Sequence, residues 1–209
     1  MTTAGPSEPT SPSAAHAWSH RIRKVGGYIQ LGFAAFWLFR GGLSVDGISG
    51  VALATAGVAL SLIVLGYALR VTAGLGRRPS GPEAKRIERS VNAATILELL
   101  ASFAFPLIVI AAGHSDWVLH SIAVTIGPLL LWLDHLVDLP RFRPVGWALT
   151  VLPFVLIAVL SGSTLAAVTG LGAGALLLLT AAAGFHDLAT LRPSTTHGAG
   201  RSRLRPRTT

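Results

Sequence analysis

Six apolar stretches, separated by short polar segments, dominate the chain between residues 25 and 184. We place them at residues 25–45, 47–69, 92–112, 117–137, 145–161 and 164–184. A helix needs about 20 mostly apolar residues to cross a hydrocarbon layer about 30 Å thick, and these stretches approach that length. The pattern therefore predicts an all-α fold: a polytopic integral membrane protein built as a bundle of six transmembrane helices.

The basic residues alternate strongly from one connecting segment to the next. Sixteen of the 17 Lys and Arg residues fall in one set of segments, and Arg40 alone falls in the other. The less basic set consists of three short connections, at residues 46–47, 113–116 and 162–163. Short loops rich in Lys and Arg stay in the cytoplasm. We therefore expect a multi-pass protein of the cell (cytoplasmic) membrane with both termini in the cytoplasm.

The overall composition supports a membrane location. A mean hydropathy of +0.61, with 51% hydrophobic and 12% charged residues, is too apolar for an ordinary soluble domain of this length. The formal net charge of +8 would suggest nucleic acid in a soluble protein. Here the basic residues lie at helix ends, where anionic lipid explains them. We expect the lipid bilayer, with anionic lipids at the cytoplasmic face, as the partner, and no nucleic acid.

Polar segments flank the predicted transmembrane domain, which covers residues 20–188. Residues 1–19 are rich in Pro, Ser, Thr and Ala, and residues 189–209 form a basic tail, so we expect both to be disordered. The largest loop between spans covers residues 70–91. Within it, Ser80-Gly81-Pro82-Glu83 is typical of a helix start, and a helix beginning there would continue into the third span.

Small residues recur at helical spacing on two spans. They are Gly50, Ala54 and Gly57 on the second span and Gly170 and Gly174 on the sixth. Such residues let helix backbones approach closely inside a membrane. Packing within one chain and a face between copies of a homo-oligomer both remain open.

Prolines interrupt three consecutive spans, at Pro106, Pro128 and Pro153. Each proline removes one backbone hydrogen bond and leaves a carbonyl free to line a cavity. Broken helices of this kind are common in transporters, although they also occur in membrane proteins without a transport role.

Four ionisable residues are candidates for a polar site within the predicted spans. Glu98 lies about two turns inside the third span, and Asp134, His135 and Asp138 close the fourth. An ionisable group inside a bilayer costs about 2.5–3.5 kcal/mol on insertion scales, so each needs a compensating role. Together they would form a cytoplasm-facing pocket that relays protons or binds a divalent cation.

A plainer interpretation of the same residues also remains open. The three residues of the fourth span would then lie at the headgroup level, solvated or paired with Arg141 and Arg143, and Glu98 would have a structural role. At the other end of this span, we expect His120 to be an interfacial histidine with a solvated ring.

Several classes of chemistry have no signature in this sequence. The chain has no cysteine, and it has no phosphate-binding loop, H-E-x-x-H pair or dinucleotide-binding glycine motif. We therefore expect no cofactor. Fifteen Arg against two Lys, with abundant Ala, Gly and Leu, is typical of coding from a GC-rich bacterial genome.

Three functional hypotheses follow. The first is a small transporter or channel-like protein with Glu98 as its intramembrane acidic site. The second is a non-catalytic accessory or scaffold protein that docks a partner, soluble or in the membrane, through the basic loop 70–91 and the C-terminal tail. The third is a membrane-embedded enzyme that acts on lipid through Asp134, His135 and Asp138.

Overall fold

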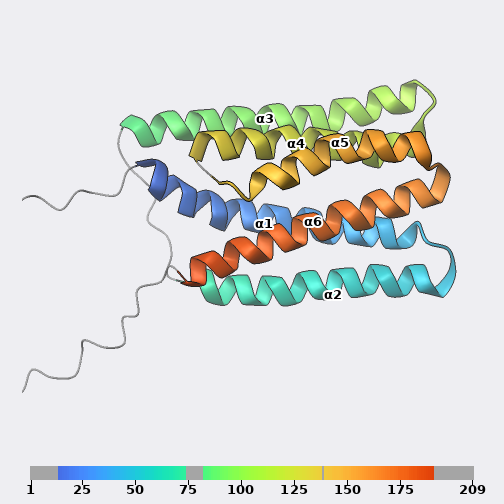
Figure 1. Ribbon diagram of the computed structural model, residues 1–209, viewed down its shortest axis with the longest axis horizontal. Coiled ribbons are helices and arrows are strands. Elements are labelled where there is room, and N and C mark those ends of the chain that lie inside the picture. Colours follow the sequence, from blue (N-terminus) through green and yellow to red (C-terminus); the bar gives the residue numbers. More distant parts are fainter. Residues whose placement is uncertain (1–13, 74–81, 138, 191–209) are drawn as a thin grey trace, which may run out of the picture.

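The structure, a computed structural model, describes residues 14–73, 82–137 and 139–190. These residues form six α-helices, with a short 3₁₀ turn, η1 (Ser115–Trp117), before the fourth, and no β-strand. The helices are α1 (Ala14–Leu43), α2 (Gly47–Thr72), α3 (Pro82–Ala111), α4 (Val118–Val137), α5 (Phe142–Val159) and α6 (Gly162–Thr190). All six overlap the predicted spans, so the described chain is an all-helical bundle (Figure 1).

Five of these helices, α2 to α6, are long and apolar enough to cross a membrane, which indicates a membrane protein. The sequence prediction counted α1 as a further span, but α1 is not among the five. Tyr28, Gln30 and Arg40 lie within α1 and lower its mean hydropathy. The structure gives α1 protein neighbours on several sides, since it packs against α2, α6, α3 and α4.

The helices run alternately in opposite directions, so their ends gather in two groups. α1 begins, and α6 ends, at the left-hand end in Figure 1. Arg70 in the last turn of α2, Lys85 near the start of α3 and Arg143 in the first turn of α5 lie at this same end, whereas Arg40 lies in the last turn of α1 at the other. The fold therefore collects the described basic residues other than Arg40 at one end of the bundle, which we call the basic end.

The three turns at the opposite end each carry a glycine with positive φ. The φ angles are 74° at Gly47, 84° at Gly113 and 58° at Gly162. Residues with a Cβ rarely adopt this backbone conformation, so glycine allows each chain reversal to be short. All three glycines lie in the short connections expected from the sequence.

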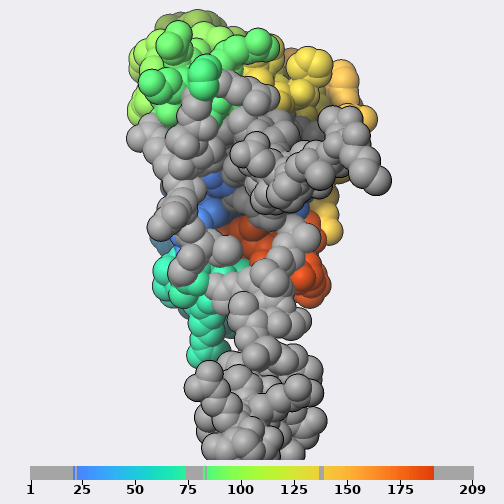
Figure 2. Space-filling model, turned by 90° about the vertical axis from the view of Figure 1, so that its left-hand side faces the viewer, coloured from blue at the N-terminus to red at the C-terminus, as the bar shows by residue number. Residues whose placement is uncertain are grey.

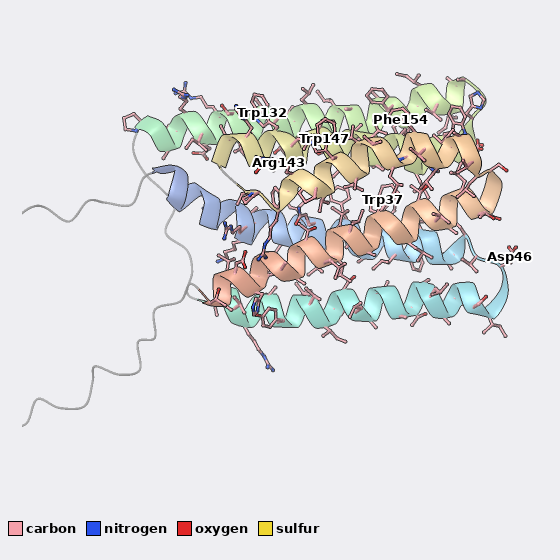
Figure 3. The ribbon with its side chains drawn as sticks, viewed as in Figure 1. Trp37, Asp46, Trp132, Arg143, Trp147 and Phe154 are labelled. Atoms are coloured by element: carbon pink, nitrogen blue, oxygen red, sulfur yellow. The ribbon has the colours of Figure 1, made fainter. Side chains whose placement is uncertain are left out.

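The centre of the bundle is the contact between α1 and α6, which is the most extensive helix pair in the described residues. Trp37 of α1 and Phe185 of α6 are fully buried, and Figure 3 shows Trp37 between these helices. α2 lies at one edge of the molecule and α3 at the opposite edge, as the end-on view in Figure 2 also shows.

The small residues singled out in the sequence lie on these internal contacts. A Cβ added at Gly170 would come within 2.5 Å of the Cα of Gly41 in α1, and one at Gly174 would meet Leu38. A Cβ at Gly57 of α2 would meet the side chain of Leu38 as well. Gly50 and Ala54 are also buried on α2. The stripes of α2 and α6 are therefore occupied by α1 within the same chain.

α3 is the least covered of the helices. It packs chiefly on α4, and most of its apolar side chains between Ile96 and Ile110 are exposed. In a bilayer these side chains would face lipid. α3 is one continuous helix from Pro82, so the described part of the loop 70–91 merges into it.

The chain ends differ in part from the expectation. α1 begins at Ala14, so the segment expected to be disordered, residues 1–19, contributes its last residues to a helix. α6 extends to Thr190, past the expected start of the C-terminal tail at residue 189. The rest of both tails, and residues 74–81 with Ser80 of the expected helix start, lie outside the described residues.

Candidate functional site

A side groove between α3 and α4 contains Glu98. Its volume is about 610 Å³, and its walls are mostly apolar. α3 contributes Leu97, Ala101 and Phe105 beside Glu98, and α4 contributes Pro128 and Trp132 among others. Two of these side chains are largely exposed, with 69% of Leu97 and 49% of Trp132 accessible. The groove is therefore a lateral opening on the outer surface of the bundle, and Figure 3 shows Trp132 on this side of α4.

Glu98 lies well inside the membrane-crossing part of α3. Arg89, an exposed basic residue near the start of the helix, precedes it by nine positions, which corresponds to about 14 Å along the helix axis. Leu97, Leu99 and Leu100 surround it in the sequence and are exposed. A carboxylate at this depth needs a proton, a partner or access to water.

A chain of hydroxyl groups connects Glu98 to α4. Ser102, one turn further along α3, donates a hydrogen bond of 2.9 Å to Oε1 of Glu98. The Ser102 hydroxyl also lies 2.7 Å from Oγ1 of Thr125 on α4. The Thr125 hydroxyl lies 2.8 Å from the carbonyl of Ile122 in its own helix. The network therefore links α3 to α4 through side-chain hydrogen bonds.

Each hydroxyl can donate only one hydrogen bond, and this limits the directions that the hydrogen bonds of the network can take. With Glu98 ionised, Ser102 donates to Glu98 and Thr125 donates to Ser102. With Glu98 protonated, the three groups can all donate in the opposite direction, ending at the carbonyl of Ile122. The same atoms thus serve both protonation states of Glu98 without a change in position.

Two prolines lie beside this network. Pro106 has no N–H to donate to the carbonyl of Ser102, and Pro128 has none for the carbonyl of Val124, which also lines the groove. Both helices therefore carry a carbonyl that lacks its normal helical donor, within one turn of the Glu98 network. The proline pattern seen in the sequence thus coincides in space with the acidic residue.

No Lys or Arg pairs with Glu98 among the residues that the structure describes. Its second oxygen, Oε2, has no hydrogen-bond partner there either. Acceptor groups therefore outnumber donors around this carboxylate.

The structure separates Glu98 from the other predicted site residues. Asp134 is 5% exposed and accepts a 2.8 Å hydrogen bond from Nε of Arg143 in the first turn of α5. His135 is exposed, and Asp138 lies outside the described residues. Neither Asp134 nor His135 lines the groove of Glu98. The expected common pocket is thus divided into a groove at Glu98 and an ion pair at Asp134.

This division bears on metal binding. In the described parts of α1 to α6, no three His, Asp or Glu side chains come together in a group that could hold a metal ion. The carboxylate of Glu98 alone is a poor site for a divalent cation, which takes six or more oxygen ligands.

Two features of the bundle were not foreseen from the sequence. The expectation of a solvated His120 is wrong: its side chain is 1% exposed, and Nε2 hydrogen-bonds to the hydroxyl of Thr169 on α6. α4 lies against α6 here, so burial between helices removes the ring from the interface where the sequence alone placed it.

The second feature is an ion-pair cluster at the basic end. Asp187 of α6 lies 2.9 Å from Arg141 and 3.7 Å from Arg23 of α1. The cluster joins the beginning of α1, the end of α6 and the turn before α5.

A scan against protein-family models, a search of curated proteins and a search of solved structures each gave no match. The function is therefore to be inferred from the residues of this chain and from their geometry.

Proposed function

We propose that this chain is a small transport protein of the cell membrane and that Glu98 is the group that binds its substrate. The observation that carries the proposal is the partly buried carboxylate of Glu98 in a groove of about 610 Å³ whose described lining contains no Lys or Arg. An acidic side chain inside a bilayer carries a free-energy cost, and such residues mark ion and substrate pathways in membrane proteins.

The proposed topology is six spans with both termini in the cytoplasm. Its support is the charge distribution: the described basic residues other than Arg40 gather at one end, and cytoplasmic loops carry the excess of Lys and Arg. α1 would serve as the sixth span because its buried polar residues, such as Gln30, face other helices. The exposed Lys85, Arg86 and Arg89 would then contact anionic headgroups.

The prolines of α3 and α4 support a transport role. Free carbonyls beside a polar side chain are the arrangement that transporters use at the centre of broken helices. Here Pro106 and Pro128 flank the contact between Ser102 and Thr125. The same contact joins α3, which has few other neighbours, to the rest of the bundle.

The test is a thermal-stability screen of the detergent-purified protein and its Glu98→Gln variant, across pH and a panel of ions. A ligand that binds the folded state raises the apparent stability by mass action. We expect a stabilising ion or pH step in the wild type that is absent from Glu98→Gln and kept in Asp116→Asn, a control at an exposed acid of η1. Flux of the stabilising ion into proteoliposomes would follow. If Glu98→Gln leaves ion flux, ligand binding and stability unchanged, the proposal is rejected.

A second candidate function is an accessory protein that docks a partner at the basic end. The exposed Lys85, Arg86 and Arg89 on the first turns of α3 favour it, since they form a basic surface on an ordered helix. Pull-down of one dominant partner that is lost when residues 192–209 are removed would support this role. An unchanged set of partners would count against it.

The lipid-acting enzyme has less support from the geometry. Asp134 is engaged by Arg143, and His135 is exposed outside the groove, so the two do not form a common site. A divalent-dependent activity abolished by His135→Ala would be needed to revive it.

A further inference from the structure

The shape of the groove between α3 and α4 restricts the kind of molecule that fits it. Its walls are apolar, and Leu97, Phe105 and Trp132 are exposed along its open side. In a bilayer this side faces the hydrocarbon region, so a ligand would enter from the lipid. A volume of about 610 Å³ is in the range of sites for small organic molecules, roughly 300–1,000 Å³.

The polar groups of the groove restrict the ligand further. Oε2 of Glu98 is an acceptor with no hydrogen-bond partner among the described residues, and Pro128 has no N–H to donate to the carbonyl of Val124, which lines the groove. A ligand that supplies N–H donors would satisfy these acceptors, whereas one that supplies only acceptors would not.

The charge of the groove also favours a ligand that supplies N–H donors, because it favours a cation. No described Lys or Arg neutralises Glu98, and an ionised carboxylate in a low-dielectric site favours a cationic partner. Trp132 offers an aromatic ring in the same groove, and aromatic faces attract organic cations.

We propose that the groove binds a small lipophilic ammonium ion, with its N–H groups on Glu98 and its apolar body against Leu97, Phe105 and Trp132. This inference rests on the proposed function and names its class of substrate.

An inorganic cation fits these observations less well. It would need several oxygen ligands or retained water, and most of the groove wall is hydrocarbon. A lipid tail or an apolar helix would fill the apolar wall but would supply no donor to Oε2 of Glu98. A molecule that carries an ammonium group on an apolar body complements both the carboxylate of Glu98 and the apolar wall of the groove.

The experiment compares two fluorescent probes of the same shape. One is 1-pyrenemethylammonium, and the other is 1-pyrenemethanol, its neutral counterpart with the same ring system. Binding to the full chain in nanodiscs is measured by energy transfer from tryptophan to pyrene, with empty nanodiscs subtracted to remove partition into lipid. We expect the ammonium to bind about tenfold or more tightly than the alcohol, as a charge-assisted hydrogen bond to Glu98 implies.

Three variants locate the binding. Glu98→Gln keeps the shape of the side chain and removes the charge, so the preference for the ammonium should disappear. Ala101→Phe fills the groove, so both probes should bind more weakly. Ala104→Phe places the same ring at an exposed position of α3 that does not line the groove, and it should leave both affinities unchanged. Thermal unfolding of each variant shows that it is folded.

Several results would overturn the inference. Equal binding of both probes to the wild type, or a preference for the ammonium that survives in Glu98→Gln, would show that the carboxylate does not select the ligand. Equal effects of Ala101→Phe and Ala104→Phe would show that the probes bind elsewhere. Absence of binding in the wild type would show that the groove does not accept such a molecule.

The outcome can be separated from that of the proposed function. If the pyrene probes show no preference while an inorganic ion still stabilises the wild type through Glu98, the substrate class is wrong and the transport proposal stands. If the ammonium binds at Glu98 but wild-type proteoliposomes do not accumulate it faster than protein-free ones, the site stands and transport of this class fails.

Discussion

Asp134 is the most deeply buried acid among the described residues, and Arg143 is its partner. The pair joins α4 to the first turn of α5, and Oδ1 of Asp134 has no further partner in the described chain. Removing one partner of such a pair leaves a buried charge without compensation. The side chain of Arg143 is 64% exposed, so solvent screens part of the interaction.

Arg143→Ala should therefore destabilise the protein by about 1–3 kcal/mol, the cost of leaving a buried acceptor unsatisfied. Thermal unfolding in detergent, followed by tryptophan fluorescence, measures the change. The double variant Asp134→Asn with Arg143→Ala should recover part of the loss, because it also removes the buried charge. Wild-type stability of Arg143→Ala alone would show that the pair has no structural role.

The hydrogen bond between His120 and Thr169 offers a second residue-scale prediction. Thr169→Val removes the hydroxyl and leaves the buried imidazole without this partner, which should cost about 1–3 kcal/mol. Thr180→Val is the matched control, because Thr180 is equally buried on α6 but bonds only to the carbonyl of Leu176 in its own helix. Equal destabilisation by the two variants would contradict the importance of the link between α4 and α6.

Local spacing explains which site residues can be found from sequence. Ser102 follows Glu98 by four positions on one helix, so their contact could be read from helical periodicity. Thr125 and Thr169 carry no such signal, since their partners lie on other helices. The sequence predicted Glu98 as an intramembrane acid from its place within an apolar stretch, but the separation of Asp134 from it depends on how α3, α4 and α5 pack.

At the scale of the helices, the lengths of the apolar stretches and the short connections between them predicted the elements well. The three short connections at Gly47, Gly113 and Gly162 lie where expected, because short reversals between apolar runs leave few alternatives. The bounds differ most where polar helix extends beyond the apolar run, as in α1 and α3. Hydropathy alone cannot predict these extensions, since the added turns contain charged residues; the extension of α3 was predicted instead from the helix-start motif at Pro82-Glu83.

The contact between α1 and α6 yields a prediction about backbone approach. Gly170→Ala places a Cβ within 2.5 Å of Gly41 Cα, and backbone atoms cannot move aside as a flexible side chain would. We expect a loss of about 1–3 kcal/mol from overpacking, measured by thermal unfolding. Gly172→Ala, two positions away with nothing within 4 Å of its Cβ, should be neutral or slightly stabilising.

The same pair of variants distinguishes internal packing from a homo-oligomer face at this stripe. If Gly170→Ala changed the oligomeric state on size-exclusion chromatography while leaving thermal stability unchanged, contact between copies would explain the glycines better than contact with α1.

At the scale of the whole molecule, the proposed orientation can be tested because the chain contains no cysteine. Single cysteines at Asp46, in the turn between α1 and α2, and at Pro140, in the turn between α4 and α5, would occupy exposed positions at opposite ends of the bundle. With the basic end in the cytoplasm, a membrane-impermeant maleimide should label Asp46→Cys on intact cells and Pro140→Cys only after permeabilisation. The reverse pattern would invert the topology, and labelling of both on intact cells would contradict a sealed six-span arrangement.

The pairing of α1 with α6 also has a consequence for biosynthesis. Of the six described helices, α1 is synthesised before the others and is the least apolar, whereas its main packing partner, α6, is synthesised after the others. In the proposed six-span topology, Gly41 of α1 therefore lacks its final neighbour, Gly170, until α6 has been synthesised. Chains that stop before α6 should leave this face of α1 uncovered, so the addition of α6 is the step that completes the packing of the described bundle.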